Sequence, residues 1–115
     1  MNASAGLTVR DISAGPEHRL ALAGELDIAS APILEATIAS LCDNGTTRIV
    51  LDLRDLTFMD STGLRALLAA DRLCAANGQT FSLAGASPPV QRLFELTGVS
   101  GALQFEPEGS GQAEA

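Results

Sequence analysis

The sequence has few of the residues that mark an enzyme, a nucleic-acid-binding protein or a metal site. It contains one histidine, His18, and two cysteines, Cys42 and Cys74, which form no C-x-x-C pair. Positive charge is scarce, because seven Lys and Arg residues stand against fourteen Asp and Glu residues and the formal net charge is -7. Nucleic acids and anionic membranes are themselves negatively charged, so we expect neither as a partner.

Long apolar runs are also missing, and none of the uncharged stretches is long enough to cross a bilayer. The first six residues lack the basic region and apolar core of a secretory signal, so we expect a cytoplasmic protein. The 115 residues, 46% of them hydrophobic, fit one domain with a real core. Cys42 and Cys74 each fall on an expected helix and are interpreted as small buried apolar residues rather than a disulfide or a metal site.

No catalytic constellation is present. A serine hydrolase needs a base near its serine, whereas His18 adjoins an expected turn and no G-x-S-x-G elbow exists. P-loop, GxGxxG and metal-ligand patterns are absent. Phosphorylation of Asp52, as in receiver domains, would need an acidic pair after the first strand, and Asp11 alone does not supply it. We therefore expect a protein that is not an enzyme and that needs no cofactor and no metal.

Apolar periodicity predicts strands at 7–12, 19–26, 48–53, 80–84 and 103–105. Three helices are expected to begin near Ser30, Ser61 and Ser87 and to end at glycine-containing turns. The order β-β-α-β-α-β-α-β favours a single α/β domain, with a mixed, mostly parallel sheet and an antiparallel N-terminal edge strand. Gly24 inside a strand predicts a bulge or a close backbone approach. Residues 1–106 are expected to form the domain, and residues 107–115 a disordered C-terminal tail.

Polar residues follow the expected parallel strands. Asp27 comes after the strand at 19–26, Asp60 and Ser61 come after the strand at 48–53, and residues 85–87 come after the next. Because the carboxyl ends of parallel strands share one edge of a sheet, we expect all of them to meet there. A helix beginning at Ser61 would offer unpaired N–H groups and a partial positive charge, which stabilise anions such as phosphate.

Two interpretations of this turn are available. Asp60 and Ser61 can be ordinary helix-capping residues, as many such pairs are. The surrounding order of elements instead favours Ser61 as a phosphorylation switch that the rest of the chain presents.

In this order of elements, the sequence resembles the STAS domain family, the fold of sulfate transporters and anti-sigma factor antagonists. The similarity covers about residues 7–105. Within the family, the sequence most resembles the free-standing bacterial anti-sigma factor antagonists. Three motifs carry it: Gly24-Glu25-Leu26-Asp27, Val50-Leu51-Asp52-Leu53 and Phe58-Met59-Asp60-Ser61-Thr62-Gly63-Leu64.

The resemblance implies a partner-switching cycle. The unphosphorylated protein would bind an anti-sigma factor, a GHKL-type serine kinase, and so release its sigma factor. Phosphorylation of Ser61, with Thr62 as the alternative acceptor, would end that binding, and a PPM-type serine phosphatase would restore it. The free protein is expected to be a monomer. The expected partner-binding residues are Asp27, Asp60, Ser61, Thr62, Gly63 and Arg65.

The sequence departs from the family at two positions and leaves three alternatives open. Many members have a second serine where this chain has Thr62. Many have glycine where this chain has Arg65. The cation of Arg65 can pair with a phosphate or change which partner docks. Asp27 can instead cap the turn before the first helix, and Gly63 can allow tight packing of a helix on a strand. The alternative function is a non-switching STAS subunit of a signalling scaffold or a lipid-transport complex.

Overall fold

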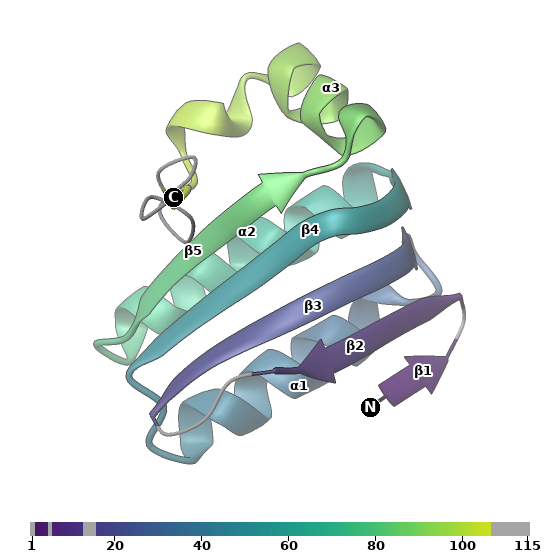
Figure 1. Ribbon diagram of the computed structural model, residues 1–115. Helices are drawn as coiled ribbons and strands as arrows, with labels where there is room; N and C mark the ends of the chain where they lie inside the picture. Colours follow the sequence, from purple (N-terminus) through teal and green to yellow (C-terminus); the bar gives the residue numbers. More distant parts are fainter. Residues whose placement is uncertain (1, 5, 13–15, 107–115) are drawn as a thin grey trace, which may run out of the picture.

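The computed structural model describes residues 2–4, 6–12 and 16–106. Within them, five strands form one sheet whose order follows the chain (Figure 1). β1 (Asn2–Ser4), β2 (Leu7–Asp11) and β3 (Glu17–Leu26) pair antiparallel. β4 (Arg48–Met59) and β5 (Thr80–Ala86) continue the sheet in parallel with β3. The expected α/β fold with a mixed sheet is confirmed.

A helix follows each of the parallel strands. α1 (Ala31–Asp43) follows β3, α2 (Ser61–Ala76) follows β4, and α3 (Pro88–Thr97) follows β5 and leads into the short helix η1 (Val99–Gly101). α1 and α2 lie side by side behind the sheet in Figure 1. Prolines stand in the first turns of α1 and α3, where a missing N–H leaves no hydrogen bond unmade. Gly98 ends α3 in the left-handed conformation, with φ of 74°.

The core lies between the sheet and the helices. Alternate residues of each strand point to one face, and on the helix-covered face these are aliphatic. Burying each such side chain fully stabilises the fold by roughly 1.5–3 kcal/mol. The fully buried aliphatic side chains include Leu20, Leu22 and Leu26 of β3, Ile49, Leu51 and Leu53 of β4, Leu34 and Ile38 of α1, and Leu67 of α2.

The strand predictions need three corrections. β1 was not expected, and because it pairs outside β2, the strand of the opening hairpin is not the edge of the sheet. β4 runs to Met59 instead of stopping at Leu53. The expected strand at 103–105 is reduced to one parallel bridge between Leu83 and Phe105.

In the described part of the chain, no helix is both long enough and apolar enough to span a membrane. The expected disordered tail, residues 107–115, lies outside the described residues.

Candidate functional site

The ends of β3 and β4 lie next to each other and bring two acidic residues together. Leu26 is paired with Met59 in the parallel register, and the backbone N–H of Asp60 donates to the carbonyl of Leu26 over 3.3 Å. Asp27 and Asp60, each the next residue in the chain, therefore stand on neighbouring strand ends. Ser61 follows at the start of α2.

Residues 85–87 do not join them. Ala86 is paired with Leu53, and the backbone N–H of Ser87 donates to the carbonyl of Leu53 over 3.3 Å. Leu53 lies six residues before the end of β4, which is roughly 20 Å along an extended strand. The expectation that residues 85–87 meet Ser61 is wrong, because β4 continues well past the end of β5.

Asp60 is the capping residue of α2. Its backbone is extended, and its Oδ1 accepts a hydrogen bond from the N–H of Gly63 over 2.9 Å. This satisfies one of the N–H groups that the first turn of a helix leaves unpaired. The capping interpretation therefore holds for Asp60 and leaves the hydroxyl of Ser61 with no part in it.

Ser61 is the first residue of α2, and its side chain is exposed. Within the described residues, neither its hydroxyl nor that of Thr62 makes a hydrogen bond, and Thr62 is the more buried of the two. The fold therefore does not use the Ser61 hydroxyl, while solvent and other proteins can reach it.

Asp27 has a structural role at the start of α1. Its Oδ1 accepts hydrogen bonds from the N–H groups of Ala29 and Ser30, both over 3.1 Å. The hydroxyl of Ser30 is turned back toward the strand, where it donates to the carbonyl of Glu25 over 2.8 Å. Capping of the turn by Asp27, one of the two interpretations of this residue, is thus present, and a partner contact at Asp27 stays a prediction.

Gly63 is buried under the end of β3. A Cβ at this position would lie 2.4 Å from the carbonyl oxygen of Leu26 and 3.0 Å from Cγ of Met59. Such distances are too short for any side chain, so tight packing of α2 on β3 requires glycine here. This accounts for Gly63 without a partner, and a partner contact at its backbone stays a prediction.

Two large apolar side chains are exposed at the neighbouring ends of β3 and β4, just before Ser61 in β4 and just after Asp27 in the loop. Phe58, near the end of β4, is 46% exposed, and Ile28, in the loop after Asp27, is 74% exposed. Met59, the residue after Phe58, is buried, so of Phe58 and Met59 only Met59 belongs to the core. Ile28 was not expected at the site. An isolated isoleucine in a polar turn is the sequence feature that could have indicated an exposed apolar side chain there. We call Asp27, Ile28, Phe58, Asp60 and Ser61 the Ser61 surface.

Arg65 lies one helical turn after Ser61 and is exposed. Side chains four residues apart on a helix face the same side, so its guanidinium is within reach of a group attached to Ser61. Among the described residues, no ion pair holds Arg65 elsewhere.

A second charged region lies on the sheet face opposite α1 and α2. There, Asp52 accepts hydrogen bonds from the backbone N–H of Arg54 over 3.1 Å and from its Nε over 3.0 Å. Burial raises the pKa of Asp52, but the hydrogen bonds and charge of Arg54, with a smaller contribution from Arg19, outweigh it and lower the pKa below its ordinary value. This pair stabilises β4 and lies away from Ser61.

Glu106 closes the described chain on the same face. Its carboxylate accepts hydrogen bonds from Arg19 of β3 over 2.9 and 3.1 Å and from Arg48 of β4 over 3.1 Å. The segment before it is held to β5 by backbone hydrogen bonds between Leu83 and residues 104 and 106. Residues 104–106 thus bind to β3, β4 and β5.

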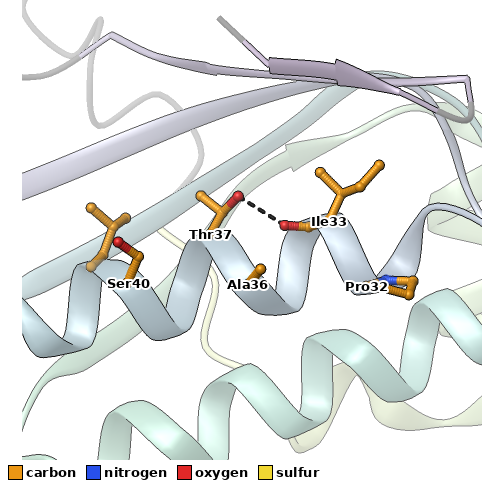
Figure 2. Close-up of a pocket in the computed structure, with 6 residues that line it drawn as sticks. Pro32, Ile33, Ala36, Thr37 and Ser40 are labelled. Carbon is orange, nitrogen blue, oxygen red and sulfur yellow. Dashed lines mark hydrogen bonds between the residues drawn. The ribbon is translucent and has the colours of Figure 1, made fainter.

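An apolar groove runs along the outer side of α1, as Figure 2 shows. It has a volume of about 580 Å³ and is lined by Pro32, Ile33, Ala36, Thr37, Ser40 and Leu41. The hydroxyl of Thr37 donates to the carbonyl of Ile33 over 2.8 Å, the bond drawn dashed in Figure 2. None of the lining side chains is an acid or a base, so the groove offers no catalytic chemistry.

Comparison with known proteins places this geometry in a family. Residues 11–105 match the family model described as Mlab, STAS domain. The anti-sigma-B factor antagonist of Staphylococcus aureus (strain NCTC 8325 / PS 47) is 32% identical over 82 residues, 71% of this chain and 76% of that protein. The crystal structure of an anti-sigma factor antagonist from Mycobacterium paratuberculosis is similar with a TM-score of 0.78 and 24% identity, covering 93% of this chain and 91% of that one.

The Bacillus cell fate determinant SpoIIAA in the phosphorylated form has a TM-score of 0.67 and 23% identity, covering 94% of this chain and 97% of that one. At these identities the solved structures establish a common fold. The matched residues include β3, β4, β5, all the helices and both loops of the Ser61 surface. On this match and on the relative in Staphylococcus aureus, the chain belongs to the STAS domain family.

Proposed function

We propose that this protein is an anti-sigma factor antagonist that phosphorylation of Ser61 switches off. The observation that carries the proposal is the exposed hydroxyl of Ser61, which the fold does not use because Asp60 caps the helix. The relative in Staphylococcus aureus is named an anti-sigma-B factor antagonist, and one similar solved structure is a phosphorylated protein. These two names support the proposal, and the exposure of the Ser61 hydroxyl supports Ser61 as the acceptor.

In the unphosphorylated state, the Ser61 surface binds the anti-sigma factor. Ile28 and Phe58 supply exposed apolar area at the neighbouring ends of β3 and β4. Large side chains of this kind carry much of the binding energy in protein interfaces once water is excluded. The partner that fits is a GHKL-type serine kinase, which releases its sigma factor when this protein binds. Such a cycle takes place in the cytoplasm.

Phosphorylation adds a charge of about -1.5 to -2 at neutral pH. The start of α2 stabilises that charge by roughly 0.3–1 kcal/mol, so the domain stays folded. Asp27 and Asp60 repel it, and an interface packed over Ser61 would have to bury it. A loss of about 3 kcal/mol in binding weakens the complex by roughly a hundredfold, which is enough for a switch. A PPM-type serine phosphatase then returns the protein to its binding state.

The test is phosphorylation by candidate kinases with ATP, followed by intact mass and mapping of the modified residue. We expect one phosphate, on Ser61. Ser61→Ala should fold, bind the kinase and resist phosphorylation, whereas Thr62→Ala should remain a substrate. Ser40→Ala, which removes an exposed serine from the far side of α1, is the matched control and should behave as the unchanged protein. Phosphorylation of Ser61→Ala together with its loss in Thr62→Ala would make Thr62 the acceptor.

The second candidate is a non-switching STAS subunit of a signalling scaffold or a lipid-transport complex. It is kept because the matching family model carries the description Mlab rather than the name of an antagonist. In that case the Ser61 surface would hold another protein permanently. A stoichiometric complex that survives ATP and in which Ser61→Asp binds as tightly as the unchanged protein would favour the subunit.

A further inference from the structure

The two cysteines, 32 positions apart in the chain, lie against each other in the fold. Cys42 is in the last turn of α1 and Cys74 is near the end of α2, and their Sγ atoms are 4.0 Å apart. Cys42 is half-buried and Cys74 is fully buried. The packing of α1 on α2 therefore creates a thiol pair that the spacing of the residues in the sequence does not show, and nothing in the proposed switch uses it.

We propose that Cys42 and Cys74 are a modification site, at which a hydroperoxide forms a reversible intramolecular disulfide between α1 and α2. In the first step, the Cys42 thiolate attacks the peroxide and becomes a sulfenic acid, and one oxygen of the peroxide leaves as water. In the second, the Cys74 sulfur attacks Sγ of Cys42, forms the S–S bond and expels the sulfenic hydroxyl as water. Two thiols and one hydrogen peroxide thus give one disulfide and two molecules of water.

The order of the steps follows from access. Cys42 is the thiol that solvent can reach, so the oxidant meets it first. Burial raises the pKa of the Cys74 thiol to about 12, and Cys42 and Asp71 add to the rise. Cys74 is therefore a poor target for the oxidant. In the second step, its place beside Cys42 holds its sulfur against the sulfenic acid, and its proton leaves with the hydroxyl as water.

Closing the bond requires only a local movement. The two sulfur atoms must approach from 4.0 Å to the length of a disulfide, about 2.05 Å. Cys42 lies one residue from the end of α1, before the turn at Asn44 and Gly45, where a helix end yields most easily. Ser61 stands at the opposite end of α2, so the bond stabilises the pair of helices without reaching the Ser61 surface.

The experiment is exposure of the purified full chain to a small excess of hydrogen peroxide, followed by denaturation, N-ethylmaleimide and intact mass without reductant. We expect a monomer whose mass is lower by two hydrogen atoms, which takes up no maleimide and regains two reactive thiols after dithiothreitol. Its melting temperature should rise by about 5–15 °C, because the cross-link restricts the unfolded chain.

Single-cysteine variants complete the test. In Cys42→Ser, peroxide should leave Cys74 reduced, and in Cys74→Ala, Cys42 should advance to sulfinic acid because no second thiol captures the sulfenic acid. Two maleimide adducts on the peroxide-treated unchanged protein, a sulfinic acid at Cys42 in that protein, or a disulfide between two chains would each overturn the proposal. Since the readout is mass and thiol content, the result does not depend on whether Ser61 is a switch.

Discussion

The first turn of α2 lies so close to β3 that Gly63 and the carbonyl of Leu26 leave no room for a methyl group. A Cβ at position 63 would lie 2.4 Å from that oxygen and 2.9 Å from Cγ of Leu26. The same contact sets where α2 begins, and therefore where Ser61 stands relative to Asp27. A change at Gly63 reaches the site through the position of the helix.

We predict that Gly63→Ala destabilises the protein by about 1–3 kcal/mol, the usual cost of forcing a group into a packed interior. Urea unfolding followed by circular dichroism measures it. The matched control is Gly101→Ala, since a Cβ at Gly101 meets nothing within 4 Å, and it should stay within about 0.5 kcal/mol of the unchanged protein. Equal stability of Gly63→Ala and Gly101→Ala would contradict the packing argument.

Which of Asp60 and Ser61 caps α2 can be measured from the unfolding free energies of their variants. Asp60→Ala removes the side chain that accepts from the N–H of Gly63, and should cost about 1 kcal/mol of unfolding free energy. Asp60→Asn keeps an oxygen for that bond and should lose much less. Ser61→Ala, measured in the same urea series, should change stability by less than about 0.5 kcal/mol. A larger loss in Ser61→Ala than in Asp60→Ala would assign the cap to Ser61.

Asp52 gives the protein a pH dependence of known sign. Because its pKa is lowered in the folded state, the stability it contributes is present above its unfolded pKa, about 3.9, and is lost as the pH falls through the folded value. Arg54→Met removes the main cause of the lowering and leaves burial, which raises the pKa. We expect this variant to be less stable at pH 7 and to lose less stability than the unchanged protein as the pH falls below about 4, because folding no longer favours the charged form of Asp52.

The check is a set of urea midpoints between about pH 3 and pH 8 for the unchanged protein, Arg54→Met, Asp52→Asn and the double variant. In the background of Asp52→Asn, the Arg54 substitution should no longer alter the pH dependence. If the urea midpoints of Arg54→Met fall with decreasing pH just as those of the unchanged protein do, Asp52 does not titrate as described.

The C-terminal boundary provides another test. Deleting residues 108–115 should change the melting temperature only slightly and leave kinase binding intact, because Glu106 and its two arginines remain. Glu106→Gln should instead cost about 1–2 kcal/mol, since Arg19 and Arg48 lose a carboxylate that is only 13% exposed. If the deletion is as harmful as Glu106→Gln, residues beyond 106 take part in the fold or in binding.

The sequence predicted the helices well because local chemistry sets their ends. Asp60 caps α2, prolines open α1 and α3, and Gly98 ends α3, and each of these signals lies within one turn of the boundary that it marks. Gly24 was expected to mark a bulge or a close approach, and both occur. The register of β3 on β4 shifts beside it, and a Cβ there would lie 2.0 Å from the carbonyl oxygen of Gly6.

The ends of the strands were less predictable, because they depend on pairing. β4 continues past the charged residues Arg54 and Asp55 through register shifts that break the alternation of apolar and polar residues. β1 has no apolar pattern and is held by its pairing with β2. At the site, the approach of Asp27 to Asp60 followed from the parallel sheet. The exposure of Phe58 and the meeting of Cys42 with Cys74 depend on how β4 and the helices pack.

The order of the sheet, β1-β2-β3-β4-β5, is also the order in which a ribosome makes the strands. In the described part of the chain, no strand is inserted between two earlier ones, so every strand after β1 pairs with the strand made just before it. Contacts between neighbours in the chain lower the entropy cost of closing loops and favour rapid folding. The described domain can therefore assemble progressively from its N-terminus, with the turn that carries Ser61 completed before β5 is made.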